Sequence, residues 1–405
     1  MTSRPTVRFL DRSTPPHIMT LVLLAGLGAL SMNIFLPSLP AMAEDFRTDY
    51  RLIQLSVALY LGVNAVLQVF IGPISDRFGR RPVMLASILI FLAATVGTLV
   101  APTVEVFLGF RALQAVIVAG LVIGRAVVRD MVPQEEAASM IGYVTMGMAI
   151  VPMVGPMIGG ALEEAFSWHA SFWLLLACGA LTLWLAWSDM GETAVQRSTS
   201  FAQQFRQYPE LLTARRFWGY CLTAAFASGA FFAFLGGAPF VGSEVFGLAP
   251  AVLGFYFGAP ALGYAFGNYL SGRFSVRLGI NRMVLAGSLL TCGGLLVLLA
   301  AELAGARHPA VFFGFVAFVG LGNGMVLPNA TAGMLSVRPQ LAGSASGLGG
   351  AIMIGGGAAL SALAGALLTP GSGPYPLLYL MLATSAASVA SILYVIRRER
   401  QVGIA

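Results

Sequence analysis

Arg111 is the residue whose position most needs a chemical explanation. It stands about six residues inside a long apolar run that begins near Glu105. A guanidinium ion in apolar surroundings costs several kcal/mol, so such a residue is a functional hypothesis by default. The simpler alternative is that its side chain extends to the near end of the run, where water begins.

No carboxylate is placed in the sequence to neutralise Arg111. None of the seventeen Asp and Glu residues lies in the middle of an apolar run. The nearest acids stand at run ends: Glu44, Asp45, Glu105, Glu163, Glu164, Glu244 and Glu302. We therefore expect positive surroundings at Arg111, which favour an anionic, zwitterionic or carbonyl-rich neutral substrate over a lipophilic cation.

Neutral polar and aromatic side chains also lie within the apolar runs. The polar ones could line a cavity or bond helix to helix, since buried amides in lipid need partners, and the sequence favours neither reading. They are Tyr60, Asn64, Gln68, Asn268, Asn323 and Asn329. The aromatic group in one later run is expected to pack in the core or face lipid rather than line a pocket: Phe226, Phe231, Phe232 and Phe234.

A charged cluster follows the second apolar run, within residues 72–81. Gly72 permits the close approach of a neighbouring helix. Asp76 can accept hydrogen bonds at the amino end of a facing helix and pair with Arg80. A loop that only fixed topology would need no acid or glycine at fixed offsets, so we expect a function for the whole set: Gly72, Asp76, Arg77, Gly79, Arg80 and Arg81.

A glycine-proline motif lies in the fifth apolar run, as Gly155-Pro156-x-x-Gly159-Gly160. Small residues four apart let helices pack closely, and proline permits a kink. Glycine-rich helix packing without any further role is the alternative for this motif.

The elements that position these residues must be membrane helices. Only 10% of the 405 residues are charged and 58% are hydrophobic, whereas a soluble chain carries roughly a quarter charged residues. In hydrocarbon only helices or closed barrels satisfy the backbone, and barrel strands alternate apolar and polar residues. Continuous apolar runs therefore predict an all-α integral membrane protein.

Twelve spans are expected, in two groups of six. The first group is 18–42, 52–75, 82–104, 106–128, 137–162 and 166–188, and the second is 217–241, 250–272, 283–303, 309–333, 340–368 and 375–396. We expect two six-helix bundles, residues 1–188 and 217–405, joined by a cytoplasmic loop at 189–216. The polar stretch before residue 18 does not fit a cleavable signal peptide.

The arginines indicate the orientation of the chain. With both termini in the cytoplasm, nineteen of the 23 arginines, Arg125 and Arg129 among them, fall in cytoplasmic segments. Arg47, Arg51 and Arg307 fall on the outer side, and Arg111 lies within a span. We therefore expect both termini in the cytoplasm.

An internal repeat supports two related halves. The segment 72–81 recurs in altered form at 271–282, about 200 residues later. The glycine-rich fifth run likewise matches the run that contains Gly355, Gly356 and Gly357, with Gly155 and Gly355 200 residues apart. Two pseudo-symmetric bundles that rock about a central site are what alternating access needs.

These motifs resemble those of a known family. The segment 72–81 resembles the loop signature of the major facilitator superfamily, and the motif at 155–160 resembles the antiporter signature of its drug exporters. Segments throughout both halves are similar to the Bcr/CflA group of twelve-span bacterial drug:proton antiporters: 35–42, 111–115, 125–130, 238–241 and 327–332. The resemblance covers essentially the whole chain.

The resemblance implies a major facilitator fold and export of drugs or other xenobiotics by alternating access. It also implies that the charged cluster latches the two halves in the outward-facing state. Asp130, an acid at the end of the fourth span, would be the third member of this latch, after Asp76 and Arg80. Arg111 and Gln114 would help to couple protons or hold the substrate. The chain departs from the family at Asn33, where relatives usually carry an Asp as proton carrier. An amide cannot titrate, so proton coupling is left open.

Two other classes of protein are alternatives to an exporter. A superfamily importer or facilitator of a small metabolite, such as an organic acid or sugar, is favoured by the missing acid and disfavoured by the glycine-proline motif. An enzyme or receptor would need clustered His, Asp or Cys at membrane depth or a large loop, so we expect no catalytic residues, no cofactor and no metal. The expected partners are a small-molecule substrate and the lipid bilayer, with protons left open and no nucleic acid. A monomer in the inner (cytoplasmic) membrane, with many spans, is expected.

Overall fold

A computed structural model describes residues 7–132, 140, 151, 154–194, 208–338 and 341–403, without the side chains of residues 208 and 342–344. Every regular element in these ranges is helical, as the sequence predicts. The first half contains α1 (Ile18–Asn33), η1 (Leu36–Ser38), α2 (Leu39–Asp45), α3 (Tyr50–Phe78), α4 (Arg80–Leu99), α5 (Val104–Gln114), η2 (Ala115–Val118), α6 (Ala119–Met131) and α8 (Trp168–Asp189). Residues 154–165 are helical as well.

The second half contains α10 (Tyr208–Leu212), α11 (Arg215–Phe240), η3 (Val241–Val245), α12 (Pro250–Tyr256), α13 (Gly258–Leu278), α14 (Ile280–Leu303), α15 (Pro309–Ser336), α16 (Ala342–Leu367) and α17 (Tyr375–Gln401). The predicted central loop at 189–216 is partly helical, because α10 and the start of α11 fall within it. Its residues 195–207 lie outside the described residues.

Ten helices in the described part of the chain are long and apolar enough to cross a membrane. They correspond to ten of the twelve predicted spans. The predicted span 137–162 lies mostly outside the described residues, and 250–272 is occupied by α12 and α13, which are not among the ten. Twelve spans therefore stay a prediction.

Helix boundaries differ from the expected ones where proline and glycine interrupt the chain. The first predicted span, 18–42, is divided into α1, η1 and α2, with Pro37 and Pro40 in the first turns of η1 and α2, where a missing N–H costs little. The expected loop between the second and third spans is a single residue, Gly79, whose φ of 100° suits glycine. Asp76 and Arg77 therefore lie on the last turn of α3, and Arg80 begins α4.

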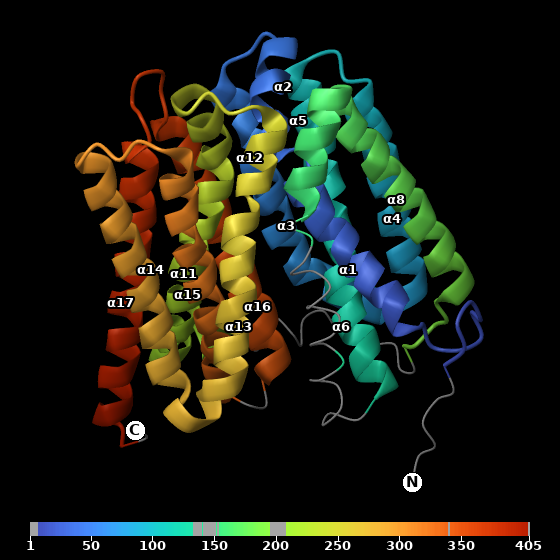
Figure 1. Cartoon of the computed structure of the whole chain (residues 1–405). Coiled ribbons are helices and arrows are strands. Elements are labelled where there is room, and N and C mark those ends of the chain that lie inside the picture. The colour runs from blue at the N-terminus through green and yellow to red at the C-terminus, as the bar shows by residue number, and fades with distance from the viewer. Residues whose placement is uncertain are drawn as a thin grey trace.

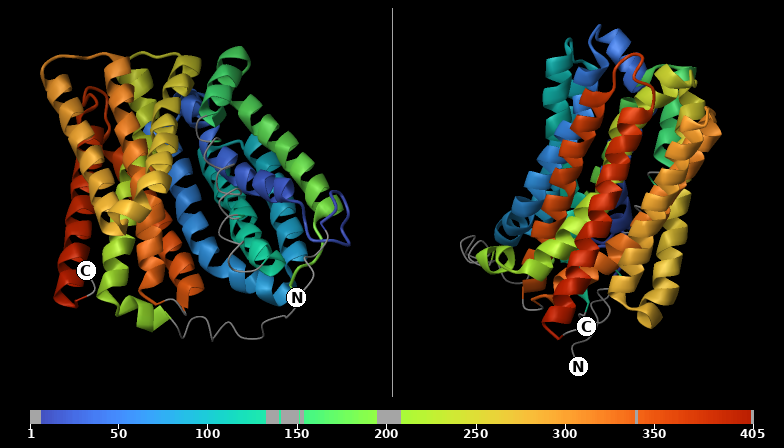
Figure 2. Two further views of the ribbon diagram at one scale, coloured as in Figure 1. Left: turned by 60° about the horizontal axis from the view of Figure 1, so that its bottom comes forward. Right: turned by 90° about the vertical axis from the view of Figure 1, so that its left-hand side faces the viewer.

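The helices form two groups (Figure 1). One group comes before residue 195 in the sequence and the other comes after residue 207. Figure 2 shows the same two groups from other directions. We call the end that carries α2 and α12 the upper end and the opposite end the lower end, as drawn in Figure 1. The groups lean together at the upper end and diverge toward the lower end, where α17 ends (Figure 1).

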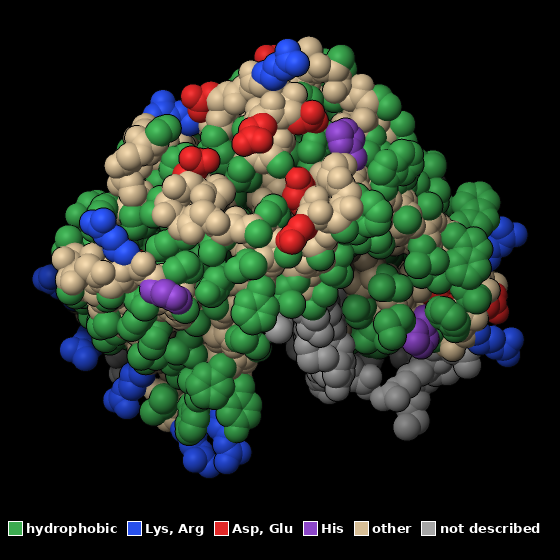
Figure 3. All heavy atoms as spheres, turned by 45° about the horizontal axis from the view of Figure 1, so that its top comes forward, with side chains coloured by type: hydrophobic (Ala, Val, Ile, Leu, Met, Phe, Trp, Pro, Cys, Tyr) green, Lys and Arg blue, Asp and Glu red, His purple; other side chains and the backbone are tan. Residues whose placement is uncertain are grey.

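Contacts between the two groups come mainly from α3, which packs along α16. At the upper end α12 packs on η1, and α11 packs on α2. Acidic side chains gather over this end (Figure 3), among them the exposed Glu44, Asp45, Asp49, Glu164 and Glu244. Most arginines visible in the same view lie toward the lower end.

Candidate functional site

Arg111 is fully buried, with 0% of its surface exposed. Its Nη1 donates hydrogen bonds to Gln114 Oε1 at 2.7 Å and Ser31 Oγ at 3.2 Å, and its Nη2 donates to the Ser31 carbonyl oxygen at 2.8 Å. The guanidinium carbon lies 4.3 Å from the ring centre of Phe35 and 4.4 Å from that of Tyr60. Cation–π attraction to two ring faces offsets part of the cost of burying the charge. The side chain therefore does not extend to the end of the span.

The partners of Arg111 are themselves fixed by further hydrogen bonds. Gln114 Nε2 donates to Thr95 Oγ1 at 2.8 Å, and the Tyr60 hydroxyl donates to the Gly28 carbonyl oxygen at 3.2 Å. The network connects α1, α3, α4 and α5. One nitrogen of the guanidinium, Arg111 Nε, takes no part in this network. It is buried and has no hydrogen-bond partner among the described residues. These contacts support a structural role for Arg111 in the conformation observed.

Asn33 ends α1 and is also fully buried, with 0% exposed. Its Nδ2 donates to the Ala29 carbonyl oxygen one turn earlier, at 2.8 Å. Its Oδ1 is buried and has no hydrogen-bond partner within the described ranges. Of the two ends of the amide, only Nδ2 is therefore paired with a described polar group.

The glycines of the 155–160 motif lie against backbone. A Cβ on Gly159 would overlap the carbonyl oxygen of Ile34, and a Cβ on Gly160 would overlap that of Pro250 in α12. Conversely, a Cβ on Gly254 of α12 would overlap the carbonyl oxygen of Pro156. The helical segment 154–165 therefore packs directly on the other half of the molecule, at the upper end.

The charged cluster binds together helices of the first half. Arg80 Nε donates to Asp130 Oδ2 at 3.1 Å, and Arg80 Nη1 forms an ion pair with Asp76. Nη1 also donates to Ser75 Oγ at 2.7 Å. Arg80 therefore joins α3, α4 and the end of α6.

Glu192 completes this cluster and was not singled out from the sequence. Its carboxylate accepts hydrogen bonds from the backbone N–H of Arg80 at 2.9 Å and of Arg81 at 3.3 Å, which are unpaired donors at the start of α4. Arg81 also donates to the Trp187 carbonyl oxygen at 3.0 Å, and Arg77 lies over the ring of Phe78. An acid three residues after α8 has no local signal in the sequence that would connect it to α4.

The close helix approach expected at Gly72 is not found among the described residues. A Cβ there would meet no described heavy atom within 4 Å. The same is true of Gly272, at the corresponding place in the second half.

The other predicted polar residues bond within or between neighbouring helices of one half. Gln68 donates to Asn64 at 2.7 Å on α3, and Asn268 donates to the Tyr264 carbonyl oxygen at 2.9 Å on α13. Asn329 of α15 donates to Ser271 Oγ of α13 at 2.8 Å. Only the Asn329–Ser271 pair joins two helices, and the other two pairs lie within one helix.

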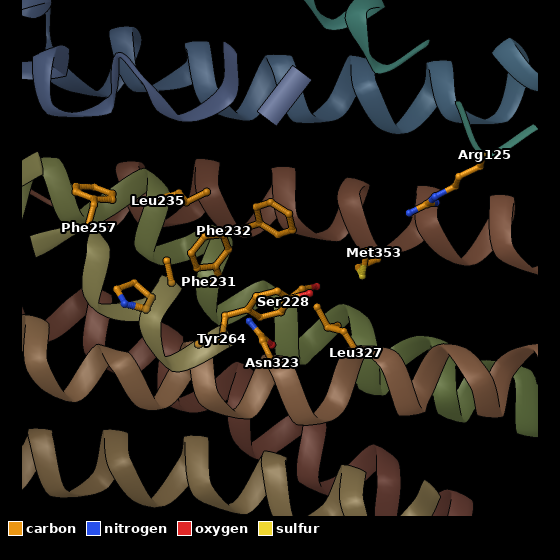
Figure 4. A pocket seen from close by; sticks show the side chains of 13 residues that line it. Arg125, Ser228, Phe231, Phe232, Leu235, Phe257, Tyr264, Asn323, Leu327 and Met353 are labelled. Atoms are coloured by element: carbon orange, nitrogen blue, oxygen red, sulfur yellow. The ribbon is translucent and has the colours of Figure 1, made fainter. Parts of the chain in front are cut away.

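A pocket of about 280 Å³ lies between the two halves (Figure 4). It is lined by α11, α13, α15 and α16 of the second half and by Arg125 of α6 from the first. The lining residues are Arg125, Ser228, Phe231, Phe232, Leu235, Phe257, Pro260, Ala261, Tyr264, Gly320, Asn323, Leu327 and Met353.

The pocket contains almost none of the residues chosen from the sequence. Of the polar candidates only Asn323 lines it. Phe231 and Phe232 line it although core packing or contact with lipid was expected for them, whereas Phe234 is buried with 0% exposed. On the sequence pattern, Arg125 counts among the arginines of the cytoplasmic segments and has no place in a site. The structure corrects this, because Arg125 lines the pocket. An apolar stretch on both sides of Arg125 is the only sequence signal for it.

Gln54 of α3 makes a hydrogen-bonded contact between the halves that the sequence did not suggest. Its Nε2 donates to the Ser361 carbonyl oxygen at 2.7 Å and to Ser361 Oγ at 3.2 Å, and 1% of the residue is exposed. A Cβ on Gly236 or Gly365 would overlap the Gln54 side chain, so small residues make room for it. Its Oε1 has no hydrogen-bond partner among the described residues.

No cluster of three or more His, Cys, Asp or Glu side chains with the geometry of a metal site occurs in the described ranges.

Comparison with known proteins assigns the chain to a family. The model of the Major Facilitator Superfamily matches residues 21–362 and 243–404. The bicyclomycin resistance protein homolog of Haemophilus influenzae is 26% identical over 96% of this chain and 98% of its own length. Multidrug resistance protein D of Escherichia coli is 29% identical over 89% and 91%. An uncharacterized MFS-type transporter of Bacillus subtilis, YdgK, is 34% identical, but the match spans only 62% of this chain and 64% of that protein.

Proposed function

The chain belongs to the Major Facilitator Superfamily, and we propose that it exports drugs or other xenobiotics by alternating access between its two halves. The observation that carries this proposal is the pocket of about 280 Å³, to which both halves contribute side chains. A pocket at the junction of two bundles changes its access when the bundles rock. The names of the relatives, a bicyclomycin resistance protein homolog and a multidrug resistance protein, support drugs as the cargo class.

The arginines support an orientation of the molecule in the membrane. The positive-inside rule puts the arginine-rich lower end, and with it both termini, in the cytoplasm. The upper end, where Gln54 and the 155–160 motif contact the other half, then faces outward and is closed. The cytoplasmic (inner) membrane of a bacterium is the location that fits the bacterial relatives.

We propose that the cluster of Asp76, Arg80 and Asp130 is the conformational latch of this transporter. Its observed contacts lie within the first half. No described atom lies within 4 Å of a Cβ at Gly72, which is compatible with a helix packing there when the lower end closes. The latch would then hold the outward-facing state.

Antiport is supported by the glycine-proline motif, which forms part of the closed contact at the upper end. Proton coupling has weaker support, because Asn33 stands in place of the family's usual acid. The pocket lining contains no carboxylate among the described residues.

The same lining favours one alternative, a superfamily facilitator or importer of a small metabolite such as an organic acid. A transporter that moves its substrate down a gradient needs no titratable carboxylate. Under this reading the chain would confer no drug resistance.

The test is expression in a drug-hypersensitive strain that lacks its own exporters, scored for resistance across a compound panel with and without a protonophore. Export predicts resistance to at least one class of compound, and proton coupling predicts that the protonophore removes it. An Asp130→Asn variant, expected to transport roughly tenfold less and produced in equal amount, is the control. Resistance to nothing would shift the proposal to the metabolite reading.

A further inference from the structure

We propose that Arg125 binds the anionic group of the transported molecule and that the cargo is a small aromatic compound with a carboxylate or similar anion at one end. This inference rests on the proposed function, because it names the substrate class of the same pocket. The preference for an anionic substrate, expected at Arg111 from the sequence, is thereby attributed to Arg125.

The two arginines of the fourth predicted span have opposite surroundings. Arg111 has three hydrogen bonds and two aromatic faces, all supplied by its own half. Arg125 lies on α6 and reaches the pocket of the other half. Its Nε is buried and has no hydrogen-bond partner among the described residues. Arg111 Nε also lacks a partner, but Arg125 is only half-buried and makes no hydrogen bond to the described residues. Its buried Nε–H is a costly unpaired donor, and an anionic ligand in the pocket would supply the missing acceptor.

The rest of the pocket fits the other parts of such a ligand. Phe231, Phe232 and Phe257 provide apolar and aromatic surface. Asn323 is 5% exposed, and its amide makes no hydrogen bond to the described residues, so it is free to bond a carbonyl or hydroxyl group. The Tyr264 hydroxyl is another polar group in the lining.

The arrangement of these groups has a direction. Arg125 approaches from one end of the pocket, the aromatic side chains lie at the other, and Met353 lies between (Figure 4). A planar carboxylate can accept two parallel hydrogen bonds from guanidinium, which favours arginine as its partner. The volume of about 280 Å³ lies just below the roughly 300–1,000 Å³ of pockets that hold drug-sized ligands, so it suits a small molecule with one or two rings.

A lipophilic cation is disfavoured by the same groups. The lining offers it no carboxylate within the described residues and one like charge, Arg125. Repulsion between like charges is strong where water is excluded. An exporter with this pocket should therefore prefer the anion of a matched pair of compounds.

Binding to the purified full-length protein tests this with three probes of one shape: 2-naphthoate, 2-naphthamide and 2-naphthylmethylammonium. Calorimetry should give 2-naphthoate an affinity on the order of tenfold higher than the amide, as expected for a charge-assisted hydrogen-bonded pair. Arg125→Gln should remove that preference and leave the amide affinity unchanged, which also shows that the variant is folded. Arg125→Lys should keep part of the preference.

Arg129→Gln is the matched control, because Arg129 is exposed one turn later on the same helix. It should leave all three affinities unchanged. The proposal is overturned if the carboxylate and the amide bind equally, if the cation binds most tightly, if none of the probes binds, or if Arg125→Gln has no effect on the preference. Resistance to cationic drugs that is unaffected by Arg125→Gln would overturn it while leaving the exporter function intact.

Discussion

The two halves of the molecule repeat a backbone but use their interiors differently. Gly79 and Gly279, 200 residues apart, both have positive φ, 100° and 83°, and each separates two long helices. Thr20 donates to Asp189 at 2.7 Å at the end of α8, and Tyr220 donates to Glu399 at 3.0 Å near the end of α17. Thr20 and Tyr220, which are 200 residues apart, thus both donate to an acid near the end of the last helix of their half, although the two acids are 210 residues apart.

The interiors diverge at the positions that carry polar chemistry. Arg111, which the first half encloses in hydrogen bonds, corresponds to Val311, and Asn33 corresponds to Ala233. Asn64, bonded within α3, corresponds to Tyr264, which lines the pocket. The first half therefore holds a bonded polar interior, and the second half holds most of the pocket. A repeated fold fixes where helices lie, while side chains decide which half contacts cargo.

The largest effect should come from removing the charge that the first half encloses. Arg111→Met removes three hydrogen bonds and two ring contacts and leaves Gln114 Oε1 buried without its donor. We expect it to lower the free energy of unfolding by about 3 kcal/mol. The midpoint of thermal unfolding of the purified protein would report this.

The comparison is sharpened by Arg125→Met, fourteen residues later in the sequence. Unlike Arg111, Arg125 is half-buried and makes no hydrogen bond to the described residues, so this variant should unfold within a few degrees of the wild type. Equal losses of stability in the two variants would contradict the distinction between a structural and a ligand-binding arginine.

The next largest effect is expected at the latch. Asp130→Asn weakens the ion pair to Arg80, which joins three helices, and should reduce transport on the order of tenfold without changing the amount of protein. Transport per molecule is measured in cells or vesicles. Glu210→Gln is the control in the second half, because its pair with Arg338 is exposed and contributes little. A strong loss of transport in both variants would contradict the assignment of the Asp76, Arg80 and Asp130 cluster as the latch.

A smaller effect should follow from Gln54→Ala at the upper end. The variant loses the hydrogen bond to Ser361 and leaves space between Gly236 and Gly365, which weakens the contact between the halves. One hydrogen bond is worth about 1 kcal/mol, so the population open at the upper end should rise about fivefold. Spin labels at residues 44 and 244, both exposed, can measure this. An unchanged distance distribution would show that Gln54 does not hold the gate.

The smallest effect is expected from Asn33→Asp, which places a titratable group in the first half. A carboxylate there should create or strengthen pH-dependent transport, about two- to threefold across the pH range in which a buried acid titrates. Transport is measured at several external pH values. Asn268→Asp on α13 is the control and should add no pH dependence. Unchanged pH dependence in Asn33→Asp would count against the first span as a coupling site.

The fold was largely predictable from the sequence, and the candidate site was not. Apolar runs predict membrane helices because the bilayer imposes length and composition on each span separately. Whether Arg111 or Arg125 contacts a pocket depends on the direction in which each side chain faces. The sequence pattern marks Arg111 as the buried one and places Arg125 among the cytoplasmic arginines. The positions of Phe232, Gln54 and Glu192 were missed for the same reason, since each meets a partner far away in the chain.

Alternating access between the two halves is tested most directly by two distances in one protein. Spin labels are placed at 44 and 244 for the upper end and at 78 and 278 for the lower end, all exposed, after replacement of Cys178, Cys221 and Cys292. We predict that adding the transported compound lengthens one distance and shortens the other. Two distances that stay fixed, or that lengthen together, would contradict a transporter whose halves rock about the central pocket.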